Sequence, residues 1–457
     1  MDLLSEFDQR DFERVGRELH GFAAELFPIC RSITGDGLRK TLAMIQERIP
    51  LQLSEVPSGT QVFDWAVPNE WNIRDGYIKV PGGERVVDFQ KFNLHVLNYS
   101  VPVRSTMTLS ELKPHLFTIP EHPDWIPYRT SYYQENWGFC LSHRQMLALE
   151  EREYEVVIDS SLEAGHLTYG EFYLPGQSTD EVLISCHACH PSLANDNLSG
   201  LTVATFLARL LAGKELRYSY RFLFVPGTIG AITWLAQNEK TVANIRHGLV
   251  LTCLGDSGPF HYKKSRRGNA TIDRVAAHVL HHHGEGAQIL EFSPNGYDER
   301  QYCSPGFNLA VGCLMRSVWG SFPEYHSSAD SLEFIKPEKL AGSLQICTAI
   351  IHVLENNCRY RNLNPFCEPQ LGRRNLYGSA GGNSPGTEVH ARLWVLNLSD
   401  GEHSLLDIAE QSGLPFSVIQ QAAAALLQGE LLERIPESDQ DFSVHAGFPH
   451  EGAQRHR

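Results

Sequence analysis

Residues 181–200 read EVLISCHACHPSLANDNLSG, and this stretch decides the fold class of the chain. Residues 181–185 have the apolar pattern of a buried strand, and residues 198–211 have that of a buried helix. Cys, His, Asn and Asp residues lie between the two patterns. In α/β proteins, ligand-binding side chains gather at the carboxyl ends of strands. The stretch therefore predicts a strand-to-helix turn that carries the chemistry of the protein.

Two chemical interpretations fit the cysteines and histidines of this turn. Residues 186–190 match the Cys-x-x-Cys-His pattern of covalent haem attachment, and the same side chains are also zinc ligands. Haem attachment is disfavoured because the pattern follows a strand and because the N-terminus lacks the basic start and apolar core of a signal peptide. Zinc is the favoured interpretation.

Composition narrows the classes of function. The chain has 457 residues, enough for two or three domains, and a formal net charge of −15. An acidic chain disfavours nucleic acid and anionic membranes as main partners, and no apolar run of about 18 residues predicts a membrane span. The ten cysteines have no compact disulfide spacing. We expect reduced thiols and a cytoplasmic location.

Strand and helix patterns alternate from about residue 132 to 360. Together with helical periodicity near the N-terminus, they predict an α/β domain formed by residues 1–58 and 132–375. Between its two parts, short strands split by Pro and Gly predict a β-rich insert over residues 59–131.

A Gly-rich break at residues 378–386 precedes a small third domain. Residues 388–437 have a pattern of three helices that is typical of a winged helix. Its predicted recognition helix carries no Lys or Arg, so we expect a docking or dimer-forming role and no DNA binding.

A second polar motif, EYHSSADS at residues 324–331, follows a later strand pattern. Catalytic zinc takes three protein ligands that mix His with carboxylate, and it leaves one position open for water. Asp196 at the start of the helix, His326 in the second motif, and His190 or His187 upstream supply such a set. We predict one metal ion at these side chains.

The order of these motifs resembles the co-catalytic zinc aminopeptidases, whose clan also includes the glutaminyl cyclases. More closely, the chain resembles a bacterial branch of that clan that has a β-rich insert and a C-terminal winged helix. The phrases that carry the resemblance span residues 29–402 and read ICRSITGDG, DWAVPNEWNI, NLHVLNYSVPV, IPYRTSYYQENWGFC, CHPSLANDNLSG, YDERQYCSPG and LWVLNLSDG. The resemblance implies a mixed α/β sheet flanked by helices. It also favours His190 over His187, because Cys-His-Pro belongs to one of these phrases.

The chain departs from the peptidase pattern at two metal ligands and at the general base. The peptidases carry a Glu-Glu pair after the next strand, where this chain has Gly227 and Thr228. Their Asp ligand after the following strand is missing here or displaced to Asp256, and Cys189 replaces the acid of their His-x-Asp pair. These departures from the family pattern therefore predict one ion per chain instead of two. Zinc is expected, with iron or another divalent metal as the alternative.

Residues 297–302, YDERQY, are the best replacement source of a general base. We expect Glu299 to act as the base and Asp298 to orient a ligand. The alternative is a surface cluster of salt bridges. Arg316 and Tyr325 flank the second motif and are candidates for binding a substrate carboxylate or carbonyl, with structural hydrogen bonding as the alternative.

These features predict a metal-dependent, aminopeptidase-like hydrolase that acts on an amide bond of a small peptide or aminoacyl conjugate. One alternative keeps the metal but forms an amide or cyclises a substrate in a biosynthetic pathway. Another is a non-catalytic scaffold on a peptidase fold. A homodimer through the C-terminal domain is the partner hypothesis.

Overall fold

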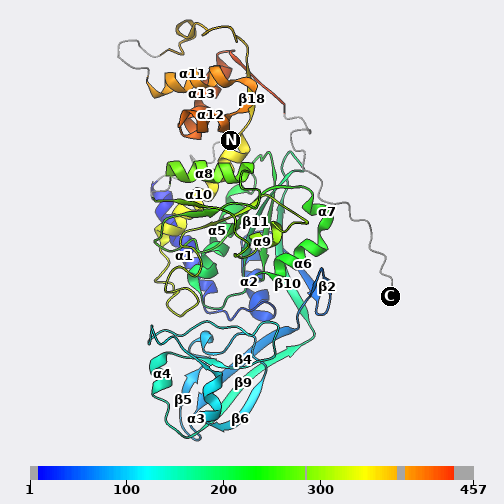
Figure 1. Ribbon diagram of the computed structural model, residues 1–457, viewed down its shortest axis with the longest axis vertical. Helices are drawn as coiled ribbons and strands as arrows, with labels where there is room; N and C mark the ends of the chain where they lie inside the picture. The colour runs from blue at the N-terminus through cyan, green and yellow to red at the C-terminus, as the bar shows by residue number, and fades with distance from the viewer. Residues whose placement is uncertain (1–8, 284–285, 378–385, 437–457) are drawn as a thin grey trace, which may run out of the picture. The chain divides into compact units, whose positions relative to one another are not determined.

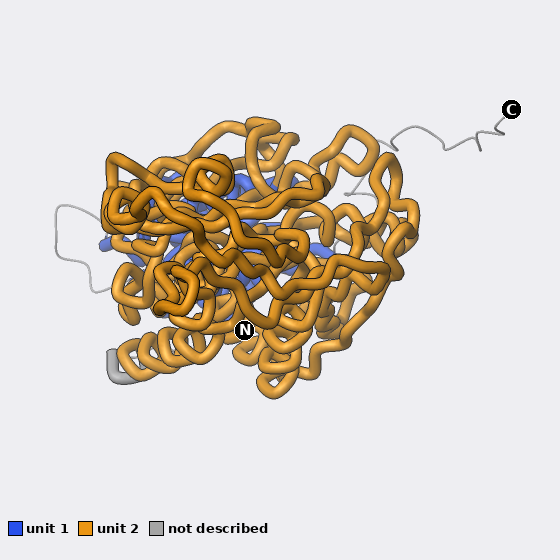
Figure 2. Tube along the Cα trace, turned by 90° about the horizontal axis from the view of Figure 1, so that it is seen from below, with its two compact units in different colours: residues 1–5, 271–285, 346–457 blue, residues 6–270, 286–345 orange. Residues whose placement is uncertain are grey.

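The structure is a computed structural model that describes residues 9–283, 286–377 and 386–436 (Figure 1). It divides into two compact units (Figure 2). The larger unit comprises residues 6–270 and 286–345, and the smaller unit comprises residues 1–5, 271–285 and 346–457. Three parts of the predicted domains lie outside the described residues. They are residues 1–8 of the predicted α/β domain, residues 378–385 of the Gly-rich break and residue 437 at the end of the predicted winged helix.

A mixed eight-stranded sheet forms the centre of the larger unit, in the order β1–β10–β12–β11–β13–β16–β14–β15. The strands are β1 Gln52–Pro57, β10 His166–Leu174, β11 Glu181–His187, β12 Ser219–Val225, β13 Ile245–Leu251, β14 His261–Lys263, β15 Gln288–Leu290 and β16 Val311–Met315. Strand β11 runs parallel to β12 and β13, and β13 runs parallel to β16. The carboxyl ends of these four strands therefore share one edge of the sheet, where the site lies.

Helices flank this sheet (Figure 1). They are α1 Gln9–Leu26, α2 Asp36–Gln46, α5 Gly200–Leu211, α6 Ile229–Gln237, α7 Glu239–Val242, the short α9 Glu299–Tyr302 and the first part of α10 Pro337–Asn356. All residues of β11 are buried, as are most of α5, which contacts β11, β12 and β13. Between them lies η4 Ala194–Ser199, a single buried turn. The predicted mixed α/β sheet and its strand-to-helix turn are confirmed.

A second sheet of the larger unit has the order β5–β4–β9–β6. Its strands are β4 Glu70–Lys79, β5 Arg85–Asp88, β6 Val103–Thr108 and β9 Glu153–Glu163. Strand β9 pairs with both β4 and β6, so this sheet extends to residue 163, beyond the predicted insert boundary at 131. The local pattern of β9 is that of any half-buried strand, and only long-range pairing assigns it to this sheet.

Short elements complete this region of the larger unit. They are the hairpin strands β2 Gln61–Val62 and β3 Trp65–Ala66, the pair β7 Leu116–Phe117 and β8 Phe139–Cys140, the helices α3 Leu109–Leu112 and α4 His143–Leu147, and the 3-10 turns η2 Asn93–His95 and η3 Lys113–His115. Buried apolar side chains from β4, β9, α3 and β8 form a core for this region that is separate from the main one.

The smaller unit contains the predicted winged helix. Its elements are α8 Thr271–His283, the end of α10, η5 Leu371–Arg374, α11 Thr387–Leu398, α12 Leu405–Ser412, α13 Phe416–Gln428 and a three-stranded sheet of β17 Arg359–Asn362, β18 Asp400–Ser404 and β19 Leu432–Arg434. Strand β17 precedes the predicted start at residue 388, yet it pairs with both β18 and β19. Helix α13 carries no Lys or Arg. Among the described residues, no helix has both the length and the apolar character needed to cross a membrane.

Candidate metal centre

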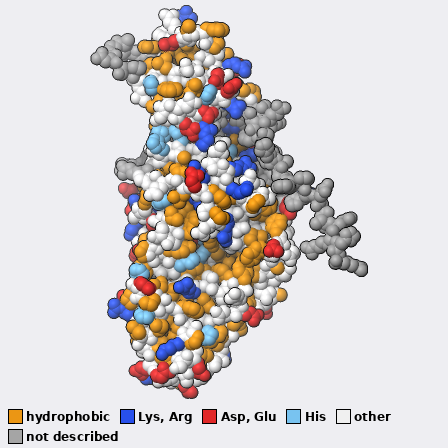
Figure 3. Space-filling model, viewed as in Figure 1, with side chains coloured by type: hydrophobic (Ala, Val, Ile, Leu, Met, Phe, Trp, Pro, Cys, Tyr) orange, Lys and Arg blue, Asp and Glu red, His pale blue; other side chains and the backbone are white. Residues whose placement is uncertain are grey.

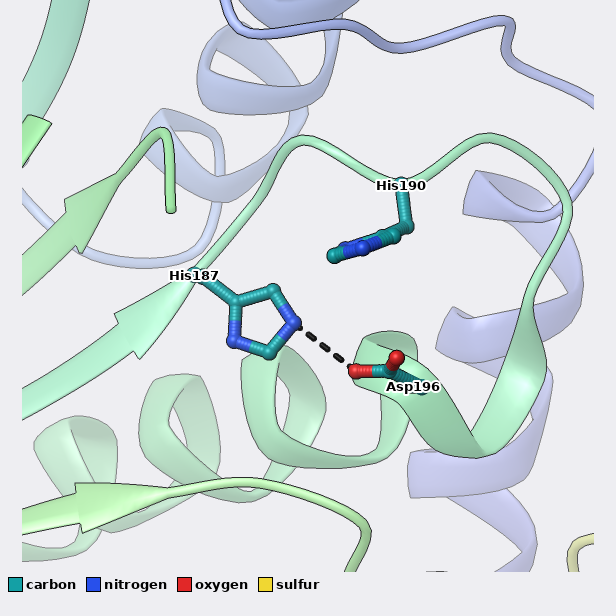
Figure 4. Close-up of side chains that lie close together, drawn as sticks. All are labelled: His187, His190 and Asp196. Carbon is teal, nitrogen blue, oxygen red and sulfur yellow. Dashed lines mark hydrogen bonds and ion pairs between the residues drawn. The ribbon is translucent and has the colours of Figure 1, made fainter. Parts of the chain in front are cut away.

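The predicted ligands meet at the carboxyl end of β11. Nε2 of His187 lies 2.8 Å from Oδ1 of Asp196, and Nε2 of His326 lies 3.1 Å from Oδ2 of the same carboxylate. One ligand atom each from His187, His190 and Asp196 lie within 4.8 Å of one another (Figure 4). The rings of His190 and His326 have centroids 5.2 Å apart. The structure therefore brings both His187 and His190 to Asp196, although the sequence analysis expected only one of them there. Together with His326, four candidate ligands meet.

The backbone around Asp196 is held by the second motif. The Asp330 carboxylate accepts hydrogen bonds from the backbone N–H of Asn195 at 2.5 Å and of Asp196 at 2.9 Å. The N–H of Ala194 donates to the carbonyl of Asp330 at 3.0 Å. Burial raises the pKa of Asp330 to about 8, against the effect of these hydrogen bonds. Asp330 thus fixes the turn that presents Asp196, and it ties the two motifs together.

His326 is positioned by a segment from a distant part of the chain. Its backbone has a φ of +56°, and its carbonyl accepts a hydrogen bond of 2.8 Å from the N–H of Tyr128. A short antiparallel bridge joins Pro127 to Ser327. Tyr325 stacks on the His326 ring, with centroids 3.9 Å apart and an interplanar angle of 12°. Tyr325 therefore lies beside the cluster, where its expected role in substrate binding stays a prediction.

Sequence reasoning missed Arg31, which supports His190. The Arg31 side chain is fully buried, and burial lowers its pKa to about 10. Its Nε donates to the carbonyl of His190 at 2.8 Å, and its Nη1 donates to the carbonyl of Leu26 at 2.7 Å. The available signal was its place in ICRSITGDG, a phrase that carried the resemblance. Arg31 holds the loop that carries His190 against α1.

The electrostatics of the cluster fit a divalent cation. Burial acts to raise the pKa of Asp196, but the charge of His190 and the hydrogen bonds from His187 and His326 hold it well below its usual range. Burial lowers the pKa of His190 well below its usual range, against the attraction of Asp196. An ionised carboxylate and a neutral imidazole are the forms that ligate metals. Imidazole nitrogen and carboxylate oxygen are also the donors that zinc takes.

The contacts of Glu299 do not fit its predicted role as the base. Its side chain is fully buried, and its Oε1 lies 2.7 Å from Nζ of Lys263 on β14. The backbone N–H of Tyr297 lies 3.2 and 3.1 Å from the two carboxylate oxygens of Glu299. Oε1 is thus engaged in a buried ion pair, and both oxygens accept from the backbone N–H of Tyr297. The correction depends on Lys263, which is 36 residues away in sequence and gave no local signal.

Asp298 fits the role of a general base better than Glu299 does. Its Oδ1 accepts a hydrogen bond of 2.6 Å from the backbone N–H of Thr228, while its buried Oδ2 has no hydrogen-bond partner among the described residues. Burial raises the pKa of Asp298 to about 7, against the attraction of His187. A free carboxylate oxygen therefore lies in the loop region where the Glu-Glu pair is missing.

The absence of a carboxylate at residue 227 has a physical reason. A Cβ atom built on Gly227 would lie 1.9 Å from the hydroxyl oxygen of Tyr297. The Gly227 N–H donates to Sγ of Cys189 at 3.2 Å, and that sulfur lies 3.6 Å from the Tyr297 hydroxyl. The Tyr297 ring packs on His187, with centroids 4.0 Å apart. Tyr297 thus fills the space that a side chain at residue 227 would need.

The contacts of Arg316 fit the alternative of structural hydrogen bonding instead of the expected substrate binding. Its guanidinium nitrogens donate to Oγ of Ser343 at 3.1 Å, to the carbonyl of Gly258 at 3.0 Å and to that of Lys339 at 3.3 Å. The same group lies over the ring of Phe260, 4.0 Å from its centroid. These contacts use all three nitrogens of the guanidinium. The sequence could not show them because all four partners lie more than twenty residues away.

Comparison with known proteins places the chain in a family. The family described as "Domain of unknown function (DUF4910)" matches residues 20–357, and a winged helix-turn-helix family matches residues 358–434. A protein of Clostridium acetobutylicum is 52% identical over 437 residues, which cover 95% of this chain and 100% of the relative. That relative is provisionally named a polysaccharide biosynthesis protein with an aminopeptidase-like domain.

Solved structures show the same fold. A crystal structure of a provisionally named peptidase from Clostridium acetobutylicum has a TM-score of 0.89 and 52% identity, and the match covers 93% of this chain and 98% of that one. A zinc aminopeptidase from Bacillus subtilis has a TM-score of 0.54 at 13% identity, with coverage of 74% and 94%. The chain therefore belongs to the DUF4910 family, and it has the fold of the zinc aminopeptidases with a C-terminal winged helix.

Proposed function

We propose that this member of the family is a metal-dependent enzyme that acts on an amide bond of a small peptide or aminoacyl conjugate. The observation that carries the proposal is the buried group of His187, His190 and Asp196 at this edge of the sheet, with the half-buried His326 hydrogen-bonded to Asp196. These side chains would hold one divalent ion, with zinc favoured by the donor set. When bound, such an ion polarises a carbonyl and lowers the pKa of a bound water.

The remaining chemistry falls to side chains around the cluster. Asp298 is our candidate for the group that accepts a proton, because one of its oxygens is free and the other is fixed by the N–H of Thr228. Tyr325, stacked on His326, is our candidate for orienting the substrate. Tyr297 closes the space above Gly227, which supports one ion per chain instead of two.

A second candidate keeps the same site but forms an amide in carbohydrate biosynthesis. The provisional name of the Clostridium acetobutylicum relative favours it. So does the burial of the cluster, because His187, His190 and Asp196 are each at most 6% exposed. A site from which water is largely excluded favours transfer of an acyl group to an amine over hydrolysis.

Metal content tests both candidates at once. Elemental analysis of protein purified without added metal is expected to give about one divalent ion per chain, and Asp196→Asn is expected to lose it. Glu299→Gln is the matched control, since it changes a buried carboxylate outside the cluster. If folded wild-type protein binds no metal after soaking with zinc, both enzyme proposals fail and the scaffold alternative stands. Hydrolysis of aminoacyl anilides by the metal-loaded protein then separates the hydrolase from the amide-forming enzyme.

A further inference from the structure

A series of aromatic rings leads from the metal cluster to the protein surface. The Tyr128 ring lies 5.0 Å from that of His326, and its hydroxyl lies 2.9 Å from the hydroxyl of Tyr132. Tyr132 is followed by Tyr133 at 6.3 Å between ring centroids, and Tyr133 by Trp65 at 5.2 Å. The series therefore joins a ligand of the cluster to a side chain on the β2–β3 hairpin.

The outer end of this series is open to solvent. Trp65 is 41% exposed, Tyr133 is 47% exposed and Phe63 is 48% exposed. Trp65 and Tyr133 meet edge to face at 64°, so the two rings form a corner, and Phe63 packs edge to face on Phe307. Figure 3 shows hydrophobic side chains reaching the surface over the part of the larger unit where Figure 1 places this hairpin.

The hairpin also lies next to the elements of the site. Strand β2 contacts α6. This helix begins one residue after Thr228, whose backbone N–H donates to the carboxylate of Asp298. Exposed polar residues flank the aromatic residues in sequence and comprise Gln61, Asp64, Gln134, Glu135 and Asn136. Exposed apolar surface rimmed by polar groups is typical of a ligand-binding site. None of these side chains is needed to hold the metal cluster.

The openness of the corner decides which ligand fits it. An apolar side chain gains most from a pocket that encloses it, whereas a ligand on these exposed rings would keep one side in water. A pyranose has one face of C–H groups, which stacks on Trp or Tyr, and a rim of hydroxyl groups, which the polar side chains can bond. A one-sided aromatic corner with a polar rim therefore matches a sugar better than it matches an apolar residue.

We propose that Trp65, Tyr133 and Phe63 form a carbohydrate subsite that binds a pyranose ring of the substrate while the amide of that substrate reaches the metal cluster. This inference rests on the proposed function, and it names the substrate class as a glycan or glycoconjugate that carries an amide. The subsite needs no metal to bind its sugar.

Ligand-observed NMR titration of the full chain with the β-linked dimer of N-acetylglucosamine tests the subsite. We expect saturable binding that weakens about tenfold in Trp65→Ala and in Tyr133→Ala, because each loses one stacking ring. Phe366→Ala is the matched control, since Phe366 is an exposed aromatic of the smaller unit, and it is expected to bind the dimer as the wild type does.

Two results would overturn the subsite: no binding of the dimer by folded wild-type protein, or equal binding by all variants. Displacement of the dimer by an equal concentration of phenylalanine amide would also overturn it, in favour of an apolar residue. Metal content and sugar titration of the wild-type protein separate the two proposals. Sugar binding by wild-type protein that takes up no metal contradicts the proposed function alone, and metal-loaded wild-type protein without sugar binding contradicts the subsite alone. Asp196→Asn is expected to bind the dimer as the wild type does, and loss of sugar binding in this folded variant would contradict a subsite that is independent of the metal.

Discussion

Two buried carboxylates of the larger unit illustrate two different uses of charge. Glu299 pairs with Lys263 at 2.7 Å, and both of its oxygens lie near donors. Within the described part of the chain, the Asp196 carboxylate has only imidazole partners, at 2.8 and 3.1 Å, which a cation can replace. A carboxylate with a fixed cationic partner stabilises a fold, whereas one whose partners are imidazoles can bind a metal together with them. The same functional group at similar burial therefore has a cationic partner in one place and metal-ligand partners in the other.

The largest effect is expected from breaking the structural pair. Glu299→Gln leaves the Lys263 ammonium buried without a counter-charge, which should lower the free energy of unfolding by about 3 to 5 kcal/mol. Urea denaturation checks this, and metal content should be unchanged in the folded protein. A stability equal to that of the wild type would show that the pair contributes nothing. The double variant Lys263→Met/Glu299→Gln should recover most of the loss.

Asp196→Asn should lower metal affinity and leave the stability of the metal-free protein nearly unchanged, which is the opposite of the result expected for Glu299→Gln. Removing the only carboxylate of the cluster should weaken metal binding by more than about 100-fold, because an amide is a poor replacement for an anionic ligand. The metal-free variant should unfold at the same urea concentration as metal-free wild type to within the effect of one hydrogen bond. Competition with a chromophoric chelator measures the affinity. Unchanged affinity would remove Asp196 from the ligand set.

A third buried group sharpens the comparison, because it has neither kind of partner. Both ring nitrogens of His247 are buried without a hydrogen-bond partner among the described residues, and burial lowers its pKa from 6.5 to about 3. The unfolded chain therefore binds this proton at higher pH than the folded chain. Stability is unaffected above pH 6.5 and falls as the pH drops from 6.5 toward 3, by about 2 kcal/mol at pH 5.

Thermal unfolding at pH 7 and pH 5 measures this loss for the wild type and for His247→Phe. The variant should lose less stability between the two values, because phenylalanine has no proton to bind. An equal loss in both proteins would assign the acid sensitivity to other groups.

The smallest effect is expected from a change at Asp330, whose carboxylate holds the turn that presents Asp196. Asp330→Asn keeps the size of the side chain but exchanges one oxygen that accepts the N–H of Asn195 or Asp196. Metal affinity should fall about tenfold, as is usual for a group that orients a ligand. The same chelator competition measures it, with Asp196→Asn as the upper limit. A loss as large as that of Asp196→Asn would mean that Asp330 itself binds the metal.

The sequence by itself determined the α/β class and the strand-to-helix turn at residues 181–200, and it predicted that Asp196, His190 and His326 belong to one site. The fold predictions succeed because a buried strand, a turn and a buried helix are written in contiguous residues. The winged helix was predicted for the same reason, apart from β17, which lies before its predicted start. His326 came from a second polar motif, 130 residues away from Asp196.

Only the tertiary structure decided which charged side chains meet. Glu299 and Asp298 are neighbours in sequence, yet one faces Lys263 on β14 and the other faces the N–H of Thr228. Arg316 is engaged by α10 and by Gly258, and β9 joins the second sheet through pairing with β4. Each of these outcomes depends on contacts between residues more than twenty positions apart. Local patterns set the elements, but long-range packing sets the partner of each buried charge, and the partner decides its role.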